Sequence, residues 1–199
     1  MKWVRKAMIS TLGFKGYLGV TSKTYLCLVK NGFLKSKYPE LFFLKQIVQP
    51  GYTCIDIGAN VGYYSYFLAK YAGQKGEIHA VEPIPMFGDR WMKNVKPGRF
   101  ATCHLHRCAL GSSEGSIRMG TPVVNGIAHH GMTKVVSESD TNIMQYFEVP
   151  MKVPDTLLSG LSKVDFIKCD VEGYEQHVFA NLTETLKKHK PLVQSELGG

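Results

Sequence analysis

The sequence lacks an apolar run approaching the ~20 residues that a membrane-spanning helix needs. It has no closely spaced C-x-x-C pair, and three of its five cysteines lie in apolar runs typical of buried strands. The N-terminus does not match a secretion signal, because its apolar run at 7–14 is short and contains Ser10, Thr11 and Gly13. We therefore expect a cytoplasmic protein with reduced core thiols and no membrane span.

Few cysteine and histidine residues have the sequence spacing that is typical of a metal site. Only the segment from Cys103 to Cys108, with His104 and His106 inside it, approaches the ligand spacing of a zinc site. Successive side chains of a strand point to opposite faces, so a strand here would divide these residues between two faces. We predict no metal site.

Positive charge predominates but is not concentrated. Lys and Arg number 24 against 16 Asp and Glu, which gives a formal net charge of +8. Such a field attracts nucleic acids, membrane surfaces and anionic substrates alike. The densest clusters, at 2–6 and 187–190, are too small for an RNA-binding stripe. We interpret the charge as solvated surface and expect no nucleic-acid partner.

What the chain does have is an alternation of strands and helices. After a helical extension over residues 1–50, we expect one α/β domain over 51–199. The expected strands are 53–57, 77–81, 102–110, 164–169 and 191–195, and the expected helices are 24–29, 40–48, 63–71, 86–95 and 174–188. Crossover connections make such a sheet largely parallel, with helices on both faces. Residues 111–145, rich in glycine and polar residues, are expected to form a long irregular loop over the active site.

Acidic residues stand at the ends of three expected strands. Ligands of parallel sheets bind at the carboxyl ends of the strands, which here gathers Asp56, Glu82 and Asp170 on one rim. The turn Gly58-Ala59-Asn60-Val61-Gly62 permits close backbone approach, and the helix after it presents free N–H groups to an anion. By itself this could be an ordinary strand-to-helix turn. Glu82 lies twenty positions after Gly62, where this architecture places an acid on a ribose diol, so an adenosine-containing cofactor is predicted.

The turn favours S-adenosylmethionine over NAD. A dinucleotide fingerprint starting at Gly58 would need glycines where Asn60 and Tyr63 stand. Asp56 at the strand end suits an ammonium group, whereas it would repel a pyrophosphate.

At this point the sequence resembles the FkbM family of methyltransferases, from about residue 50 to the C-terminus. The resemblance rests on Asp56–Gly62, Glu82-Pro83 followed by Asn94, Ala109-Leu110-Gly111 with Glu114-Gly115, Asp155–Leu158, and Asp165–Glu175. The Lys-x-Asp-x-Glu-Gly-x-Glu pattern from Lys168 to Glu175 is the most specific part.

The resemblance implies a Rossmann-like class I methyltransferase fold, a three-layer α/β/α sandwich with a mostly parallel sheet. It also implies methyl transfer to an oxygen, commonly a hydroxyl of a sugar or another small molecule. The residues then expected around the cofactor are Asp56, Gly58, Ala59, Asn60, Gly62, Tyr63, Glu82, Pro83, Ala109, Leu110 and Asp170.

An alcohol acceptor must lose a proton, and four residues are candidates for the general base. Asp170 is the first choice because it ends a strand, and Glu172, His129 and His130 are the others. As alternatives, Asp170 and Glu172 could cap the next helix, and the histidines could simply be exposed. Lys168 is expected to be structural, paired with Glu172 or Glu175.

The sequence departs from the family pattern at its C-terminus. It ends just after the fifth expected strand, whereas class I methyltransferases normally add two more. We expect either a fragment or a sheet edge covered in another way, for example in a homodimer. The competing functions are a nucleic-acid methyltransferase, although Asp170-Val171-Glu172-Gly173 differs from the Asn/Asp-Pro-Pro-Tyr/Phe typical of base amino-group methylation, and a cofactor-binding remnant without turnover.

Overall fold

The computed structural model of the protein describes residues 2–124, 127–137 and 140–195. Its helices are α1 (Lys2–Lys30), α2 (Pro39–Ile47), α3 (Tyr63–Ala72), α4 (Pro85–Val95), the 3-10 turn η1 (His130–Met132), α5 (Pro154–Leu158), α6 (Glu175–Ala180) and α7 (Thr183–His189). Its strands are β1 (Thr53–Ile57), β2 (Glu77–Val81), β3 (Thr102–His106), β4 (Ala109–Leu110), β5 (Gly115–Val124), β6 (Ile127–Ala128), β7 (Lys134–Val135), β8 (Ile143–Lys152), β9 (Phe166–Cys169) and β10 (Leu192–Ser195).

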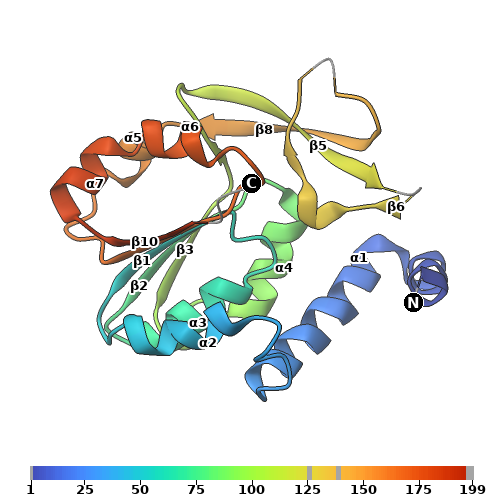
Figure 1. Cartoon of the computed structure of the whole chain (residues 1–199), viewed down its shortest axis with the longest axis horizontal. Coiled ribbons are helices and arrows are strands. Elements are labelled where there is room, and N and C mark those ends of the chain that lie inside the picture. The colour runs from blue at the N-terminus through green and yellow to red at the C-terminus, as the bar shows by residue number, and fades with distance from the viewer. Residues whose placement is uncertain (1, 125–126, 138–139, 196–199) are drawn as a thin grey trace.

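The central sheet is the parallel sheet that the alternating pattern predicts. Its five strands run in the order β10-β9-β1-β2-β3, and every neighbouring pair is parallel. Helices α2, α3 and α4 cover one face, and α5, α6 and α7 cover the other (Figure 1). The three-layer α/β/α sandwich is therefore confirmed.

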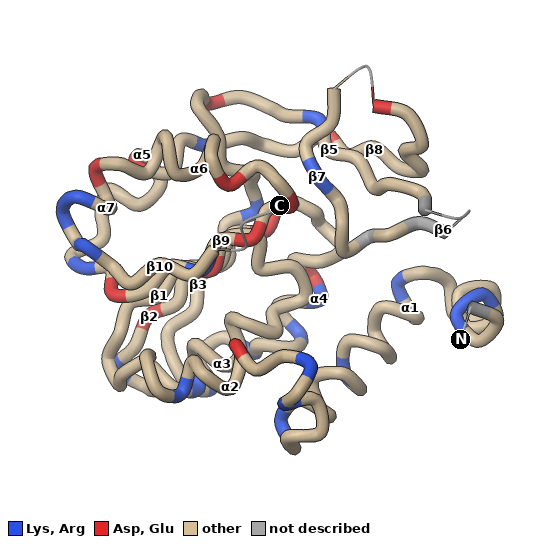
Figure 2. Tube along the Cα trace, viewed as in Figure 1, with Lys and Arg blue, Asp and Glu red and all other residues tan. Residues whose placement is uncertain are grey.

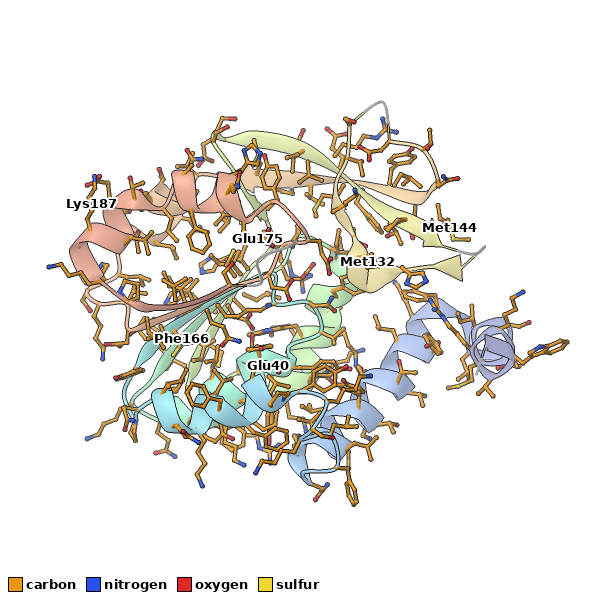
Figure 3. All side chains as sticks on the ribbon, viewed as in Figure 1. Glu40, Met132, Met144, Phe166, Glu175 and Lys187 are labelled. Atoms are coloured by element: carbon orange, nitrogen blue, oxygen red, sulfur yellow. The ribbon has the colours of Figure 1, made fainter. Side chains whose placement is uncertain are left out.

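Each face of this sheet buries its own apolar cluster. On one face Cys54 and Phe166 pack against Leu44 of α2 and Phe67 of α3, and Figure 3 shows Phe166 on that side. On the other face, residues such as Ile55 of β1 and Ile167 of β9 pack with Leu158 of α5, Val178 of α6 and Leu182, the N-cap of α7. Alternate residues of β1 therefore point into different layers, which explains why all five of them are buried.

The expectation of a long irregular loop at 111–145 is wrong. About half of that stretch belongs to a second sheet, in which β5 pairs antiparallel with β8 and carries β6 and β7 (Figure 1). The pairing is stabilised by apolar cross-strand neighbours, because Ile117 lies opposite Val149 and Met119 lies opposite Phe147. Glycines and a proline in β5 obscure this alternation in the sequence.

Three other expected elements have different boundaries. The strand expected over 102–110 ends at His106, and Ala109-Leu110 instead pairs with Met151-Lys152 of β8. The helix expected over 174–188 divides into α6 and α7, since the carboxylate of Asp155 accepts N–H bonds from Glu184 and Thr185 and thereby begins a new helix. The first helix is far longer than expected, with a left-handed kink at Gly13 (φ 65°).

In the part of the chain that the structure describes, no helix is both long enough and apolar enough to span a membrane. Lys and Arg are spread over several elements, with groups at the start of α1 and along α7 (Figure 2).

Candidate active site

The turn after β1 is held in a conformation that requires its glycines. Gly58 and Gly62 have φ angles of 73° and 88°, in the left-handed region. A Cβ on Gly58 would lie 1.9 Å from the carbonyl oxygen of Asp170, because the ends of β1 and β9 approach each other there. A Cβ on Gly62 would lie 2.7–2.8 Å from side-chain atoms of Val95 and Trp91. The two glycines bring the turn against β9 and α4.

Hydrogen bonds fix the same turn from the β2 side. The N–H groups of Gly58 and Ala59 both donate to the carbonyl of Val81 at 3.0 Å. The buried side chain of Asn94 donates from Nδ2 to the carbonyl of Val61 at 2.8 Å. The turn is therefore preformed, as a ligand-binding loop must be to avoid an ordering cost.

Glu82 completes this cradle. One of its oxygens accepts the N–H of Asn60 at 2.8 Å and the other accepts the N–H of Ile84 at 2.7 Å. Burial raises the pKa of Glu82 to about 7, although the two N–H bonds oppose that rise. Each carboxylate oxygen has a second lone pair, so Glu82 can still accept hydroxyl protons from a ligand.

Asp56 is more deeply placed than a direct cofactor contact would require. It is fully buried, and its Oδ2 accepts a 2.5 Å hydrogen bond from Ser65, whose hydroxyl accepts the indole N–H of Trp91 at 2.7 Å. Burial raises the pKa of Asp56, and the positive charge of Lys168 opposes the rise. Asp56 thus supports the site from below.

Lys168 connects the two acids of the rim. Its Nζ lies 3.7 Å from Asp56 Oδ1 and 3.3 Å from Asp170 Oδ2, and it donates to the carbonyl of Gly58 at 3.2 Å. The expected pairing with Glu172 or Glu175 is therefore wrong. Asp56 lies beside Lys168 in the parallel register of β1 and β9, which a linear reading of the sequence does not reveal.

Glu175 instead shapes the loop after β9. Its carboxylate accepts the N–H of Val171 at 2.8 Å, and Figure 3 shows it at the start of α6. Helix α6 begins at Glu175 with Tyr174 as its N-cap, so neither Asp170 nor Glu172 occupies the capping position. The alternative capping role of these two acids is wrong.

A cavity of about 530 Å³ opens above the turn. Its walls come from the β1 turn, the ends of β2 and β9, the inner face of α1, and the second sheet with η1. Of the predicted site residues, those that line it are Gly58, Ala59, Asn60, Tyr63, Glu82, Pro83, His129, Asp170 and Glu172.

The remaining predicted residues lie elsewhere. Among the described residues, Asp56, Gly62, Ala109 and Leu110 are buried and are not part of the cavity lining. The side chain of His130 lies outside the part that the structure describes. The cavity therefore unites most, but not all, of the predicted set.

The sequence reasoning missed the wall that α1 provides. Its lining residues recur at helical spacing and are Phe14, Tyr17, Leu18, Thr21 and Tyr25, joined by Arg5. Tyr64 of α3, which was not among the predicted site residues, also lines the cavity. The periodicity was visible in the sequence, but nothing indicated that α1 folds back over the strand ends.

Together, the parallel sheet between two helical layers and the glycine turn with acids on one rim define a Rossmann-like α/β methyltransferase. The model of the methyltransferase FkbM domain family matches residues 56–198, and the chain belongs to that family. Its cofactor is S-adenosylmethionine.

Solved structures add only a distant likeness. A fibrillarin from Aeropyrum pernix, in complex with natively bound S-adenosyl-L-methionine, shares 15% identity over 72% of this chain and 43% of its own, with a TM-score of 0.41. An S-adenosylmethionine-dependent methyltransferase from Aquifex aeolicus shares 19% identity over 72% of this chain and 54% of its own, with a TM-score of 0.36. The chain thus spans about half the length of each structure. No curated protein matches the chain.

The cavity suits the family's cofactor. Its volume lies within the roughly 300–1,000 Å³ of small-molecule sites. Glu82 provides a carboxylate for ribose hydroxyls, and the backbone of the Gly58–Val61 turn lines the cavity beside it. The residues present therefore fit an adenosine-containing ligand.

Proposed function

We propose that the protein methylates a hydroxyl oxygen of a sugar or another small molecule. The observation that carries the proposal is that Asp170 lines the same cavity as the cofactor turn and Glu82. An acid at this position can receive a hydroxyl proton beside the bound methyl donor. The rest of the cavity supports an acceptor of modest size.

Different residues of the chain would hold the cofactor and the acceptor. Glu82 and the Gly58–Val61 turn would hold the ribose and the adjoining part of S-adenosylmethionine, which when bound supplies an electrophilic methyl group on a sulfonium. Holding the acceptor in line with that carbon is the main contribution expected of the walls, because orientation alone can supply a large part of the acceleration.

Asp170 is our candidate for the general base. Lys168 lies 3.3 Å from Asp170 Oδ2 and holds the carboxylate in place at the end of β9. The acceptor's hydroxyl would donate its proton to this carboxylate as the new bond forms. Glu172 and His129 also line the cavity and are the next candidates.

The wall opposite the turn suggests what the acceptor presents. Phe14, Tyr17 and Tyr25 of α1 provide aromatic faces, and Arg5 adds a positive charge. Aromatic faces suit ring-shaped molecules with apolar C–H surfaces, among them sugars. A small acceptor fits this enclosure better than a duplex nucleic acid, which would need an open basic groove.

The test begins with turnover. Purified protein would be incubated with radiolabelled cofactor and pools of sugars and other hydroxylated small molecules, and label transfer would be followed. We expect transfer to a hydroxyl and expect Asp170→Asn to lower it by ~100-fold or more while leaving S-adenosylhomocysteine affinity within about twofold.

Asp89→Asn is the matched control, because Asp89 is an exposed aspartate on α4 that pairs with Arg107 away from the cavity. It should leave turnover unchanged. Unchanged turnover in Asp170→Asn would instead transfer the base role to Glu172 or His129. Cofactor binding without transfer to any pool would contradict the proposed activity.

A further inference from the structure

A cluster of titratable side chains lies away from the cavity, on the β2–β3 edge of the sheet. In the β2–β3 register His79 lies opposite His104, and Val81 lies opposite His106. Glu77, His79, His104 and His106 occupy alternate positions of the two strands and share one face. The parallel pairing thus brings together residues that are 27 positions apart in the sequence.

The spacing of their polar atoms matches a small coordination sphere. Glu77 Oε1 lies 3.0 Å from His104 Nε2 and 3.2 Å from His79 Nε2. One ligand atom from each of these residues lies within 4.8 Å of the others. Ligands about 2.0–2.2 Å from a tetrahedral zinc ion are about 3.3–3.6 Å apart, so the two pairs with Glu77 are near this spacing and the widest pair would have to close by up to about 1.5 Å.

His79 is already prepared as a ligand. Its side chain is 9% exposed, and its Nε2 is buried and has no well-aligned hydrogen-bond partner among the described residues. Its other nitrogen, Nδ1, lies 3.1 Å from His106 Nε2. If Nδ1 donates to His106, Nε2 is the unprotonated nitrogen and its lone pair is available to a metal ion, as in metal-ligating histidines held by a second-layer partner.

The charge state suits a cation. Neutral imidazole is the form that binds metals, and Glu77 adds one negative charge. The side chains of Glu77 and His104 are 40% and 45% exposed, which leaves the site open to water on one side.

We propose that Glu77, His79 and His104 bind a divalent transition-metal ion of the zinc class, with His106 orienting His79. Two imidazoles and one carboxylate form a ligand set typical of Zn²⁺, and solvent would occupy the fourth position. This replaces the prediction of no metal site. The sequence did not indicate it because Glu77 and His79 precede His104 by a whole helix.

This ion would lie away from the cavity. In the described part of the chain, none of its ligands lines the cavity, and Glu77 lies five residues before Glu82 on β2, roughly 16 Å along the strand. The ion would join β2 to the edge strand β3. Since it binds only the folded arrangement, it would stabilise that edge in proportion to its concentration.

The test is a Zn²⁺ titration of the full chain after treatment with a chelator, against a competing chromophoric chelator. We expect one ion per chain at this site, and a dissociation constant at least tenfold higher in His104→Ala and in Glu77→Gln. Both side chains are partly exposed, so these variants should fold. His106→Gln should weaken binding 10- to 100-fold without removing a ligand.

His177→Ala is the control, because His177 is an exposed histidine of α6 and should leave the affinity unchanged. Added Zn²⁺ should also raise the unfolding midpoint of the unmodified chain more than that of His104→Ala. Co²⁺ should give the intense visible absorption of a tetrahedral site. Equal Zn²⁺ affinity in the unmodified chain and His104→Ala would overturn the proposal, even if binding at other histidines persisted.

Discussion

Polar side chains are stabilised differently in two regions of the parallel sheet. One region is the carboxyl ends of the strands, beside the cavity, and the other is the β2–β3 edge. At the carboxyl ends, the fully buried Asp56 and the cavity-lining Asp170 share the cation of Lys168. At the β2–β3 edge, burial lowers the pKa of the buried His79 and of the half-buried His106, and the one carboxylate of the cluster, on Glu77, is partly exposed. The first group depends on internal charge pairing, whereas the second keeps its one carboxylate in contact with solvent and can accept a cation from outside.

The largest effect on stability should follow from removing the positive charge of Lys168 at the carboxyl ends of the strands. Lys168→Met leaves the buried Asp56 without its nearby positive charge, and an unpaired buried charge costs ~3–5 kcal/mol. We expect the free energy of unfolding, measured by denaturant titration, to fall by about that amount at pH 7.

The double variant Asp56→Asn/Lys168→Met serves as the control, since it removes the stranded carboxylate along with the lysine. It should recover part of the loss. If Lys168→Met lowered the unfolding free energy by less than about 1 kcal/mol, the carboxyl ends of the strands would not depend on charge pairing. The proposed difference between the two regions would then be wrong.

A smaller but still large effect is expected from Gly58→Ala. The new Cβ would lie 1.9 Å from the Asp170 carbonyl oxygen at a φ of 73°, so the ends of β1 and β9 must move apart. We expect a loss of more than ~2 kcal/mol in unfolding free energy together with weaker S-adenosylhomocysteine binding.

Gly73→Ala is the matched control, because Gly73 has a φ of 67° and a Cβ added there would have no neighbouring atom within 4 Å. It should show only the strain of that backbone conformation (φ 67°, ψ −171°), ~1–3 kcal/mol, and normal binding. Equal losses in the two variants would mean that the approach of β1 to β9 is not what requires Gly58.

The same contrast explains what the sequence could predict. β1 and β2 were located to the residue, because short apolar runs bounded by glycine or proline have a clear pattern. Asn60, Glu82 and Asp170 were placed in one cavity by a general rule about strand ends.

The features that the sequence does not predict depend on contacts between segments that are distant in the chain. The partner of Lys168 and the grouping of His79 with His104 follow from strand register, which residue spacing does not define. The α1 wall depends on a long helix folding back, and β5 and β8 were missed because glycine and proline weaken their alternation.

A more modest effect concerns pH at Glu82. Burial raises the pKa of Glu82 to about 7, so its stabilising contribution is present below the ordinary glutamate pKa and is lost as pH rises through about 7. Cofactor affinity should change in the opposite direction, since the ionised carboxylate accepts ribose hydroxyls. Between pH 6 and 8, calorimetry should show S-adenosylhomocysteine binding about tenfold tighter at the higher pH. A Glu82→Gln variant should bind weakly with a flat pH profile, and the same slope in that variant would assign the titration to another group.

The smallest effect should come from the β2–β3 edge. Glu77→Gln removes the one carboxylate of the histidine cluster, but that side chain is 40% exposed, and ion pairs at such positions contribute about 0–1 kcal/mol. In chelator-treated protein, denaturant titration should therefore show a change below about 1 kcal/mol, far less than for Lys168→Met. In the presence of Zn²⁺ the difference between Glu77→Gln and the unmodified chain should widen, because only the unmodified chain keeps all three ligands. A large loss of unfolding free energy in Glu77→Gln without metal would show that Glu77 makes an ion pair as important as that of Asp56. Both regions of the sheet would then depend on internal charge pairing.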